Sequence, residues 1–286
     1  MIIFKLYKSI RSILFQEGIR NFYIRKFRGK LKGKKWFVIH YRDLKIKILL
    51  KEKNGYVDQY IYKNGTYEKE IIDLIHSKIN KDSVFVDIGA NIGQHSLIIS
   101  HYVKEVIAFE PLQFLADQFR QSVEKNNIKN IKIEQIGLGN RKETQSVYID
   151  DNQSGYTTLL DHLEKTPGLR KNENSNLIRQ EIKIDTLDNY LGNQKIHFIK
   201  MDIEGYEYYA ILGAMHTIKS HKPFIIMEFS NMFYESHEKG LTAKFFYLLK
   251  SLDYTIKSLE RNKIIETIED IDFSKKQENY FLIPNS

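Results

Sequence analysis

The spacing of apolar residues changes near residue 83. From there on, short apolar runs of strand length alternate with longer amphipathic stretches. The runs that predict strands are 84–88, 105–110, 131–136, 196–202, 224–229, 254–259 and 279–283, and those that predict helices are 92–102, 112–126, 206–219 and 241–251. A polar stretch from about 140 to 180 interrupts the pattern and is expected to be irregular. We predict an α/β fold with a doubly wound, seven-stranded sheet, and an antiparallel edge because the last two strands are close in sequence.

The first 66 residues follow a different pattern, and we predict an N-terminal extension of a domain that occupies 67–286. Within 2–16, apolar residues recur at helical spacing with basic residues between them, which predicts a basic amphipathic helix. Two apolar runs, 36–41 and 44–50, flank a short polar turn and predict a β-hairpin. A further helix is expected at 67–79.

The positive charge of the chain is concentrated at its N-terminal end. Residues 1–53 contain 16 Lys and Arg and three acids, whereas the remaining 233 residues contain 28 Lys and Arg and 33 acids. We therefore expect a mildly acidic globular body with a basic front end. The 18 Tyr and 17 Phe argue against general disorder. The absence of Cys excludes disulfides, thiolate metal sites and a cysteine nucleophile.

The N-terminal helix leaves two interpretations open. No segment has the ~20 consecutive apolar residues that cross a bilayer, and basic residues within the first 15 argue against a secretory signal. A cytoplasmic protein is therefore expected. The basic region 2–35 either lies on the inner face of an anionic membrane as a peripheral contact, or its helix packs on the protein itself. Packing is the commoner use of an amphipathic helix.

A glycine-rich loop follows the first strand of the alternating region. Asp87 lies near the end of this strand, and the chain continues through Gly89 and Gly93 into a helix. Gly89 permits a tight turn, and Gly93 permits a close approach of the helix to a ligand. The next strand ends in Glu110, followed by Pro111 at the start of a helix. Ligands of open α/β sheets bind beyond these strand ends, where an acid can accept hydrogen bonds from two ribose hydroxyls.

Two adenosine-containing cofactors compete for such a loop. A NAD site requires G-x-G-x-x-G, which neither register of the loop supplies. The carboxylate of Asp87 would also repel a pyrophosphate, whereas S-adenosylmethionine (SAM) carries a positive ammonium and a positive sulfonium. The residues therefore favour SAM.

A second group of ionisable residues lies at the fourth predicted strand. Lys200, Asp202 and Glu204 alternate along the chain, so they project from one face if the strand persists. Charges inside an otherwise apolar strand at a ligand-binding edge favour catalysis over helix capping. His95, in the first turn after the glycine loop, and Glu228, at the end of the following strand, are further candidates.

These motifs resemble the FkbM family of SAM-dependent methyltransferases. The matching elements are Asp87-Ile-Gly-Ala-Asn-Ile-Gly93, Phe109-Glu-Pro111, Leu187-Asp188, Lys200-Met-Asp-Ile-Glu-Gly205, and Pro223 with Glu228. The resemblance covers about residues 58–230 and implies a Rossmann-like class I methyltransferase that methylates oxygen atoms, mostly on sugars or polyketides. The cofactor-binding residues expected are Asp87, Gly89, Ala90, Asn91, Gly93, Glu110, Pro111 and Asp202. The segment 154–158 resembles a loop that the family places over its site.

We therefore expect an O-methyltransferase of polysaccharide biosynthesis, acting on a hydroxyl of a sugar, polysaccharide or glycolipid precursor. The catalytic residues expected are Asp202, Lys200, Glu204 and His95. Asp202 is the first candidate for the general base; alternatively, Asp202 and Glu204 hold a divalent cation that lowers the pKa of the hydroxyl. No H-x-x-x-H pair is present, so a zinc site is not expected.

Other functions stay open beside this one. The basic front end would suit RNA. However, Asp202-Ile-Glu-Gly stands where enzymes that methylate base amines carry Asn/Asp-Pro-Pro-aromatic, which argues against methylation of base amines and leaves ribose methylation open. Nucleic acid is therefore not the expected partner. A small-molecule acceptor of the polyketide type is a further alternative. A non-catalytic SAM-binding module would require Lys200 and Asp202 to be dispensable.

Overall fold

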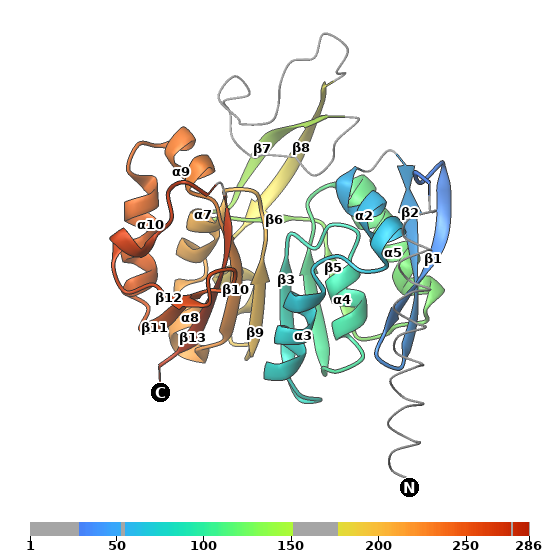
Figure 1. Ribbon diagram of the computed structural model, residues 1–286, viewed down its shortest axis with the longest axis horizontal. Helices are drawn as coiled ribbons and strands as arrows, with labels where there is room; N and C mark the ends of the chain where they lie inside the picture. The colour runs from blue at the N-terminus through green and yellow to red at the C-terminus, as the bar shows by residue number, and fades with distance from the viewer. Residues whose placement is uncertain (1–28, 53–54, 151–176, 276, 286) are drawn as a thin grey trace, which may run out of the picture.

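The computed structural model describes residues 29–52, 55–150, 177–275 and 277–285. The helix expected at 2–16 and the loop at 154–158 therefore lie outside the described residues. Within them, the largest sheet has the strand order β12-β11-β13-β10-β9-β3-β4-β5 (Figure 1). Its strands are β3 (Val84–Ile88), β4 (Glu105–Phe109), β5 (Ile131–Glu134), β9 (Phe198–Met201), β10 (Phe224–Phe229), β11 (Tyr254–Ser258), β12 (Lys263–Ile264) and β13 (Glu278–Pro284).

The topology is that of a doubly wound α/β sheet, as predicted, with two differences. The two-residue strand β12 brings this sheet to eight strands in the part of the chain that is described. The antiparallel strand β13 lies inside the sheet rather than at its edge: Phe281 pairs with Ile226 of β10 on one side and with Lys257 of β11 on the other. Residues 259–277, which include β12, connect β11 to β13 and are long enough for β13 to enter between β10 and β11, where it pairs antiparallel with both.

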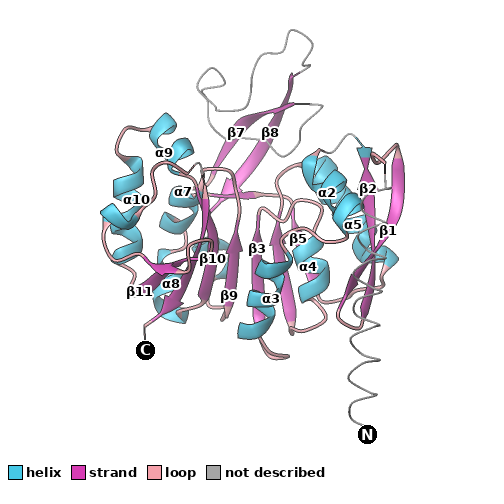
Figure 2. Ribbon diagram, in the orientation of Figure 1, coloured by secondary structure: helices cyan, strands magenta, loops and turns pink. Residues whose placement is uncertain are grey.

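Strand alternation divides the core into two layers. Phe85 of β3 packs in a cluster with helices α3 (Lys69–Lys78), α4 (Gln94–Ile99) and α5 (Gln113–Lys125). Its neighbours Val84 and Val86 point to the other face, which is covered by α6 (Leu187–Leu191), α7 (Glu207–Leu212), α8 (Met215–His221) and α10 (Leu241–Lys250). The last three of these helices are labelled in Figure 2. The helix predicted at 206–219 is split into α7 and α8 at Gly213, where a Cβ atom would lie 1.9 Å from the carbonyl oxygen of Gly139.

The N-terminal segment packs against the main sheet domain through α5. The predicted hairpin is formed by β1 (Lys34–Tyr41) and β2 (Leu44–Lys51), and it is followed by α2 (Tyr56–Asn64), which the apolar pattern did not predict. The Leu49 N–H donates to Ser122 Oγ at 3.1 Å, and its carbonyl accepts from Gln118 Nε2 at 2.8 Å. The hairpin and α2 lie at one end of the large sheet, opposite α10 (Figure 1). The domain boundary at residue 66 stays a prediction.

The polar region after β5 contains regular structure that the sequence analysis did not expect. Strands β7 (Glu143–Asp150) and β8 (Leu177–Asp185) pair antiparallel, and β6 (Gly137–Leu138) joins β8. The expectation of an irregular stretch was therefore wrong for the described ends of this region. Buried Val147 and Ile182 supply the apolar face. Among the described residues, no helix is both long and apolar enough to span a bilayer.

Candidate active site

A cavity of about 510 Å³ opens beyond the carboxyl ends of β3, β4, β9 and β10. Its volume lies in the range of small-molecule sites, and its place matches the ligand-binding edge of open α/β sheets. We call the wall formed by residues 88–92 and 109–112 the loop side. The wall that contains Asp202, Glu204 and Glu228 is called the carboxylate side.

The two glycines of the loop have different structural roles. Gly89 has φ +78°, and a Cβ atom there would lie 1.9 Å from the carbonyl oxygen of Asp202, so the loop can pass the end of β9 only with glycine. Gly93 has φ +80°, and its Cβ would lie 2.0 Å from the ring of Phe119. The second glycine therefore allows α5 to pack closely, and it does not line the cavity as Gly89, Ala90 and Asn91 do.

Glu110 is held firmly on the loop side. It is buried, and its two carboxylate oxygens accept the N–H groups of Asn91 at 2.8 Å and of Leu112 at 2.9 Å. Burial raises the pKa of Glu110 to about 7, although the two N–H groups act in the opposite direction. Each carboxylate oxygen has a second lone pair, so Glu110 can still accept hydrogen bonds from a bound diol. Pro111 lines the cavity beside it.

Asp87 and Lys200 face each other across the paired strands β3 and β9. The Ser96 hydroxyl donates to Asp87 Oδ2 at 2.6 Å, and Lys200 Nζ lies 3.9 Å from Asp87 Oδ1. Lys200 Nζ also lies 3.4 Å from Asp202 Oδ2. Burial disfavours the charged ammonium, but the carboxylates of Asp202 and Asp87 outweigh it and raise the pKa of Lys200. Lys200 lines the cavity and Asp87 does not, so contact between Asp87 and a cofactor stays a prediction.

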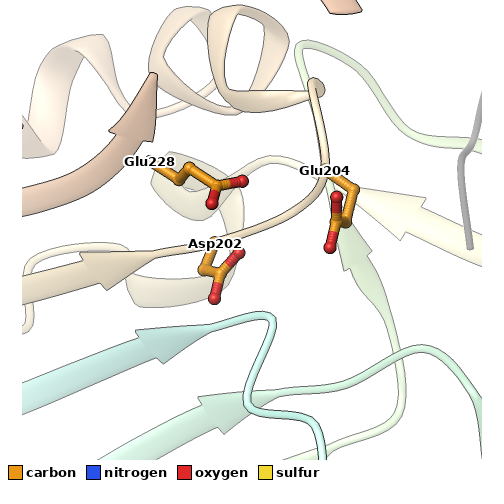
Figure 3. A group of neighbouring side chains, drawn as sticks. All are labelled: Asp202, Glu204 and Glu228. Carbon is orange, nitrogen blue, oxygen red and sulfur yellow. The ribbon is translucent and has the colours of Figure 1, made fainter. Parts of the chain in front are cut away.

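Three carboxylates meet on the other wall, each beyond or near a strand end (Figure 3). Asp202, Glu204 and Glu228 each offer an oxygen, and these oxygens lie within 4.8 Å of one another. Because β9 ends at Met201, strand alternation does not place Glu204; a left-handed backbone at φ +53° turns it back towards the group. Burial and the charge of Asp202 raise the pKa values of Glu204 and Glu228 well above their usual range. Lys200 pairs with Asp87 and Asp202, and Glu228 belongs to the acid group.

A buried glutamate, Glu207, holds the loop that carries Asp202 and Glu204. Glu207 Oε1 accepts the N–H of Ile203 at 2.9 Å, and its Oε2 accepts the hydroxyl of Tyr234 at 2.9 Å. Tyr234 belongs to α9 (Asn231–His237), a helix that the sequence pattern did not predict. The loop between Asp202 and Glu204 is thereby fixed to a neighbouring helix. Such an arrangement of hard oxygen ligands can accept a proton or hold a divalent cation such as Mg²⁺.

His95 lies beside a glutamate that the sequence analysis missed. His95 is buried and lines the cavity, and its Nε2 lies 3.5 Å from Glu68 Oε2. Burial, and then the charge of Lys200, lowers the pKa of His95 well below its usual value, so the imidazole is neutral at pH 7. Burial and the charge of Asp202 raise the pKa of Glu68 to about 7. Glu68 has φ +47°, which nothing in the local sequence indicates.

Tyr67 was also missed, although it lines the cavity. Its N–H donates to Gln94 Oε1 at 2.8 Å, and its carbonyl accepts from Gln94 Nε2 at 2.8 Å. Gln94 begins α4 directly after the glycine loop. The segment before α3 is therefore attached to the loop side. The number of tyrosines between 56 and 67 was the available signal in the sequence.

The chain is similar to known methyltransferases in sequence and in structure. The family model described as the methyltransferase FkbM domain matches residues 87–256, and no curated protein matches the chain. Methyltransferase FkbM from Methylobacillus flagellatus KT is 19% identical with a TM-score of 0.43, over 79% of this chain and 54% of that one. An rRNA methylase from Streptococcus thermophilus is 11% identical with a TM-score of 0.44, over 76% and 95%.

A third solved structure is the tRNA (uracil-54, C5)-methyltransferase of Pyrococcus abyssi in complex with S-adenosyl-L-homocysteine. It is 11% identical with a TM-score of 0.43, over 86% of this chain and 43% of that one. Structural likenesses at these identities and scores carry no information about the methyl acceptor.

Proposed function

The chain belongs to the FkbM family of SAM-dependent methyltransferases, and we propose that it methylates a hydroxyl group of a sugar in a polysaccharide or glycolipid precursor. The observation that carries this proposal is the carboxylate group at the end of β9. Asp202 is partly exposed, lies 3.4 Å from a buried ammonium, and lines the same cavity as Glu110. A hydroxyl acceptor requires such a proton acceptor, because it is a poor nucleophile until its proton is removed.

The residues of the loop side fit SAM. A glycine cradle and a buried acid with free lone pairs suit an adenosine ribose, with Glu110 accepting its hydroxyls. When bound, SAM supplies an electrophilic methyl group. Lys200 and Asp87 form a charged pair between the two sides and orient Asp202.

We assign to Asp202 the removal of the hydroxyl proton during methyl transfer. The side chain of Lys200 keeps a positive charge beside the carboxylate, which holds it in place. A carboxylate fixed in this way can align the hydroxyl oxygen with the methyl group. In the alternative role, Asp202, Glu204 and Glu228 hold a divalent cation that lowers the pKa of the hydroxyl.

The proposed function is tested by glycan composition. Mass spectrometry of cell-surface glycans, with the intact gene and with an Asp202→Asn allele, should differ by one methyl group on one sugar. Complementation with the unaltered gene should restore the methyl group. Identical glycans in the two strains, with RNA ribose methylation lost in the variant, would instead support the alternative of a ribose methyltransferase.

The ribose alternative is favoured by one observation. Lysines at 34, 45 and 47 are exposed on the hairpin, and the pairing of β1 with β2 places them on the same face as exposed Trp36. Such a patch would bind phosphates with an affinity that falls steeply as salt is added. Binding of a structured RNA that is insensitive to salt, or absent at low salt, would remove this candidate.

A further inference from the structure

Three tyrosines form a cluster at the mouth of the cavity. The ring centroids of Tyr56 and Tyr60 are 5.7 Å apart, those of Tyr60 and Tyr67 are 5.3 Å apart, and those of Tyr56 and Tyr67 are 6.2 Å apart. Tyr56 and Tyr67 line the cavity, yet Tyr56 is 60% exposed. A large aromatic side chain that is held against its neighbours and still open to solvent at a cavity is available for a ligand.

The cluster is attached to the molecule at two buried points. The backbone of Tyr67 is bonded twice to Gln94, both at 2.8 Å. Asp58 of α2 is fully buried, and its Oδ1 accepts the N–H of Lys51 at 2.7 Å and Nε2 of Gln118 at 2.8 Å. The rings are therefore positioned before any ligand arrives, so that ordering them costs little on binding.

Tyr67 connects the cluster with the carboxylate side. Burial, together with the negative charges of Glu68, Asp202 and Glu228, raises the pKa of the Tyr67 hydroxyl, which therefore remains a hydrogen-bond donor. Tyr67 lines the same cavity as Asp202, Glu204 and Glu228, and it is followed directly by Glu68, whose Oε2 lies 3.5 Å from His95 Nε2. A ligand on the aromatic cluster therefore shares the cavity with these carboxylates.

Charge decides what kind of ligand fits. Among the described residues that line the cavity, Glu110, Asp202, Glu204 and Glu228 carry carboxyl groups, and Lys200 carries an ammonium that lies 3.4 Å from Asp202 Oδ2 and 3.9 Å from Asp87 Oδ1. A phosphate-rich or carboxylated ligand would find this ammonium already paired with carboxylates. An uncharged pyranose ring has one face of C–H groups, which suits an electron-rich aromatic face, and a rim of hydroxyls, which suits carboxylate acceptors.

We propose that Tyr56 and Tyr67 form the acceptor subsite, on which an uncharged pyranose ring of the glycan stacks with one hydroxyl directed to Asp202. This subsite rests on the proposed sugar O-methylation and adds to it the recognition of a neutral ring. It also gives the segment 56–67 a specific role: this segment, rather than the family motif, selects the acceptor.

The subsite can be tested by saturation-transfer NMR on the full chain saturated with S-adenosylhomocysteine. The probes are the methyl pyranosides of glucose, galactose, mannose and rhamnose, with methyl glucuronide as the anionic comparison. The variants are Tyr56→Ala, Tyr56→Phe and the control Tyr247→Ala, which removes a tyrosine that is 61% exposed on α10. Calorimetry with S-adenosylhomocysteine verifies that each variant is folded.

We expect at least one neutral pyranoside to bind, with about a tenfold loss of affinity in Tyr56→Ala, a magnitude typical of losing one stacked ring. Tyr56→Phe and Tyr247→Ala should bind as the unaltered protein does. Equal binding by Tyr56→Ala, tighter binding of the glucuronide, or no binding of any pyranoside would overturn the subsite. If a pyranoside is methylated with an unchanged KM in Tyr56→Ala, the subsite fails and sugar methylation stands; if only RNA is methylated, both fail.

Discussion

The loop side of the cavity is formed mainly by backbone, whereas the carboxylate side is formed by side chains. On the loop side, two short segments follow adjacent parallel strands, and backbone N–H groups hold the central acid, Glu110. On the carboxylate side, side chains from β10, the end of β9 and the segment 56–68 meet from distant parts of the chain. A wall made by the backbone at a sheet edge needs only local sequence, whereas a wall made by side chains depends on tertiary packing. We assign the first wall to the cofactor and the second, with its proton-accepting side chains, to the proposed acceptor.

The largest effect is expected from removing the charge of Asp202. Asp202→Asn keeps the shape of the side chain but cannot accept the proton and is a weaker ligand for a cation, so turnover should fall by about 10²-fold or more. The affinity for S-adenosylhomocysteine should change little, because Glu110 is untouched. Asp117→Asn, an exposed acid of α5 paired with Arg120, is the control. Turnover that survives in Asp202→Asn would assign the base to another group, such as His95 or Glu228.

Chelation separates the two roles open to Asp202. With Asp202 as a direct base, EDTA leaves turnover unchanged; with a cation held by the three carboxylates, EDTA abolishes turnover and Mg²⁺ restores it. In the second case, Glu228→Gln should raise the Mg²⁺ concentration needed for half-activity, because a neutral amide is a weaker ligand. Direct Mg²⁺ binding by calorimetry gives a readout that is independent of the acceptor.

The loop side should respond to Glu110→Ala with a loss of cofactor affinity. A charge-assisted hydrogen bond of this kind contributes roughly 1.5–3 kcal/mol, so the dissociation constant of SAM should rise about tenfold to a hundredfold while the protein stays folded. The control is Glu105→Gln at the start of β4, the strand that Glu110 follows. An unchanged dissociation constant, measured by calorimetry, would place the ribose elsewhere and contradict the assignment of the loop side to the cofactor.

The same carboxyl group predicts a pH dependence with a definite sign. Burial raises the pKa of Glu110 to about 7 in the free protein, and only the ionised form accepts both hydroxyl donors. The ionised fraction grows from about one-tenth at pH 6 to about nine-tenths at pH 8, so binding of S-adenosylhomocysteine should tighten by nearly tenfold over this interval. Glu110→Gln should flatten the curve. Binding that weakens as the pH rises would contradict the prediction.

The sequence predicted the two sides of the cavity unequally. Strand periodicity and the glycine spacing predicted β3, the turn at Gly89 and the acid at Glu110, because each depends on residues close in sequence. The charges on β9 were found because they interrupt an apolar run. Glu68 and Tyr67 were not found, since a left-handed backbone at Glu68 and two hydrogen bonds to Gln94 bring them to the site. Local pattern does not encode either feature.

The region after β5 is a second place where the local sequence pattern did not predict the structure. Its polar composition indicated irregular structure, yet β7 and β8 pair over their described lengths. One face of this strand pair contributes Val147 and Ile182 to the lining of the cavity, whereas the other face carries polar residues. Half-exposed strands of this kind have few apolar residues, so that composition alone does not distinguish them from loops. The helix at 2–16, which the sequence does predict, lies outside the described residues and stays a prediction.

The smallest effect concerns Gln94, which joins the two sides. Gln94→Ala leaves the N–H and carbonyl of Tyr67 without their partners, and each such group costs roughly 1–3 kcal/mol when it stays buried. The melting temperature should therefore fall by several degrees, and pyranoside binding should weaken a few-fold because the tyrosine cluster loses one of its two attachments. Gln113→Ala, on the exposed start of α5, is the matched control. S-adenosylhomocysteine should bind within about threefold of its normal affinity, since the two N–H groups that hold Glu110, those of Asn91 and Leu112, are left in place. A loss of cofactor affinity as large as that in Glu110→Ala would mean that Gln94 serves the cofactor directly, and the two walls would then be one continuous site.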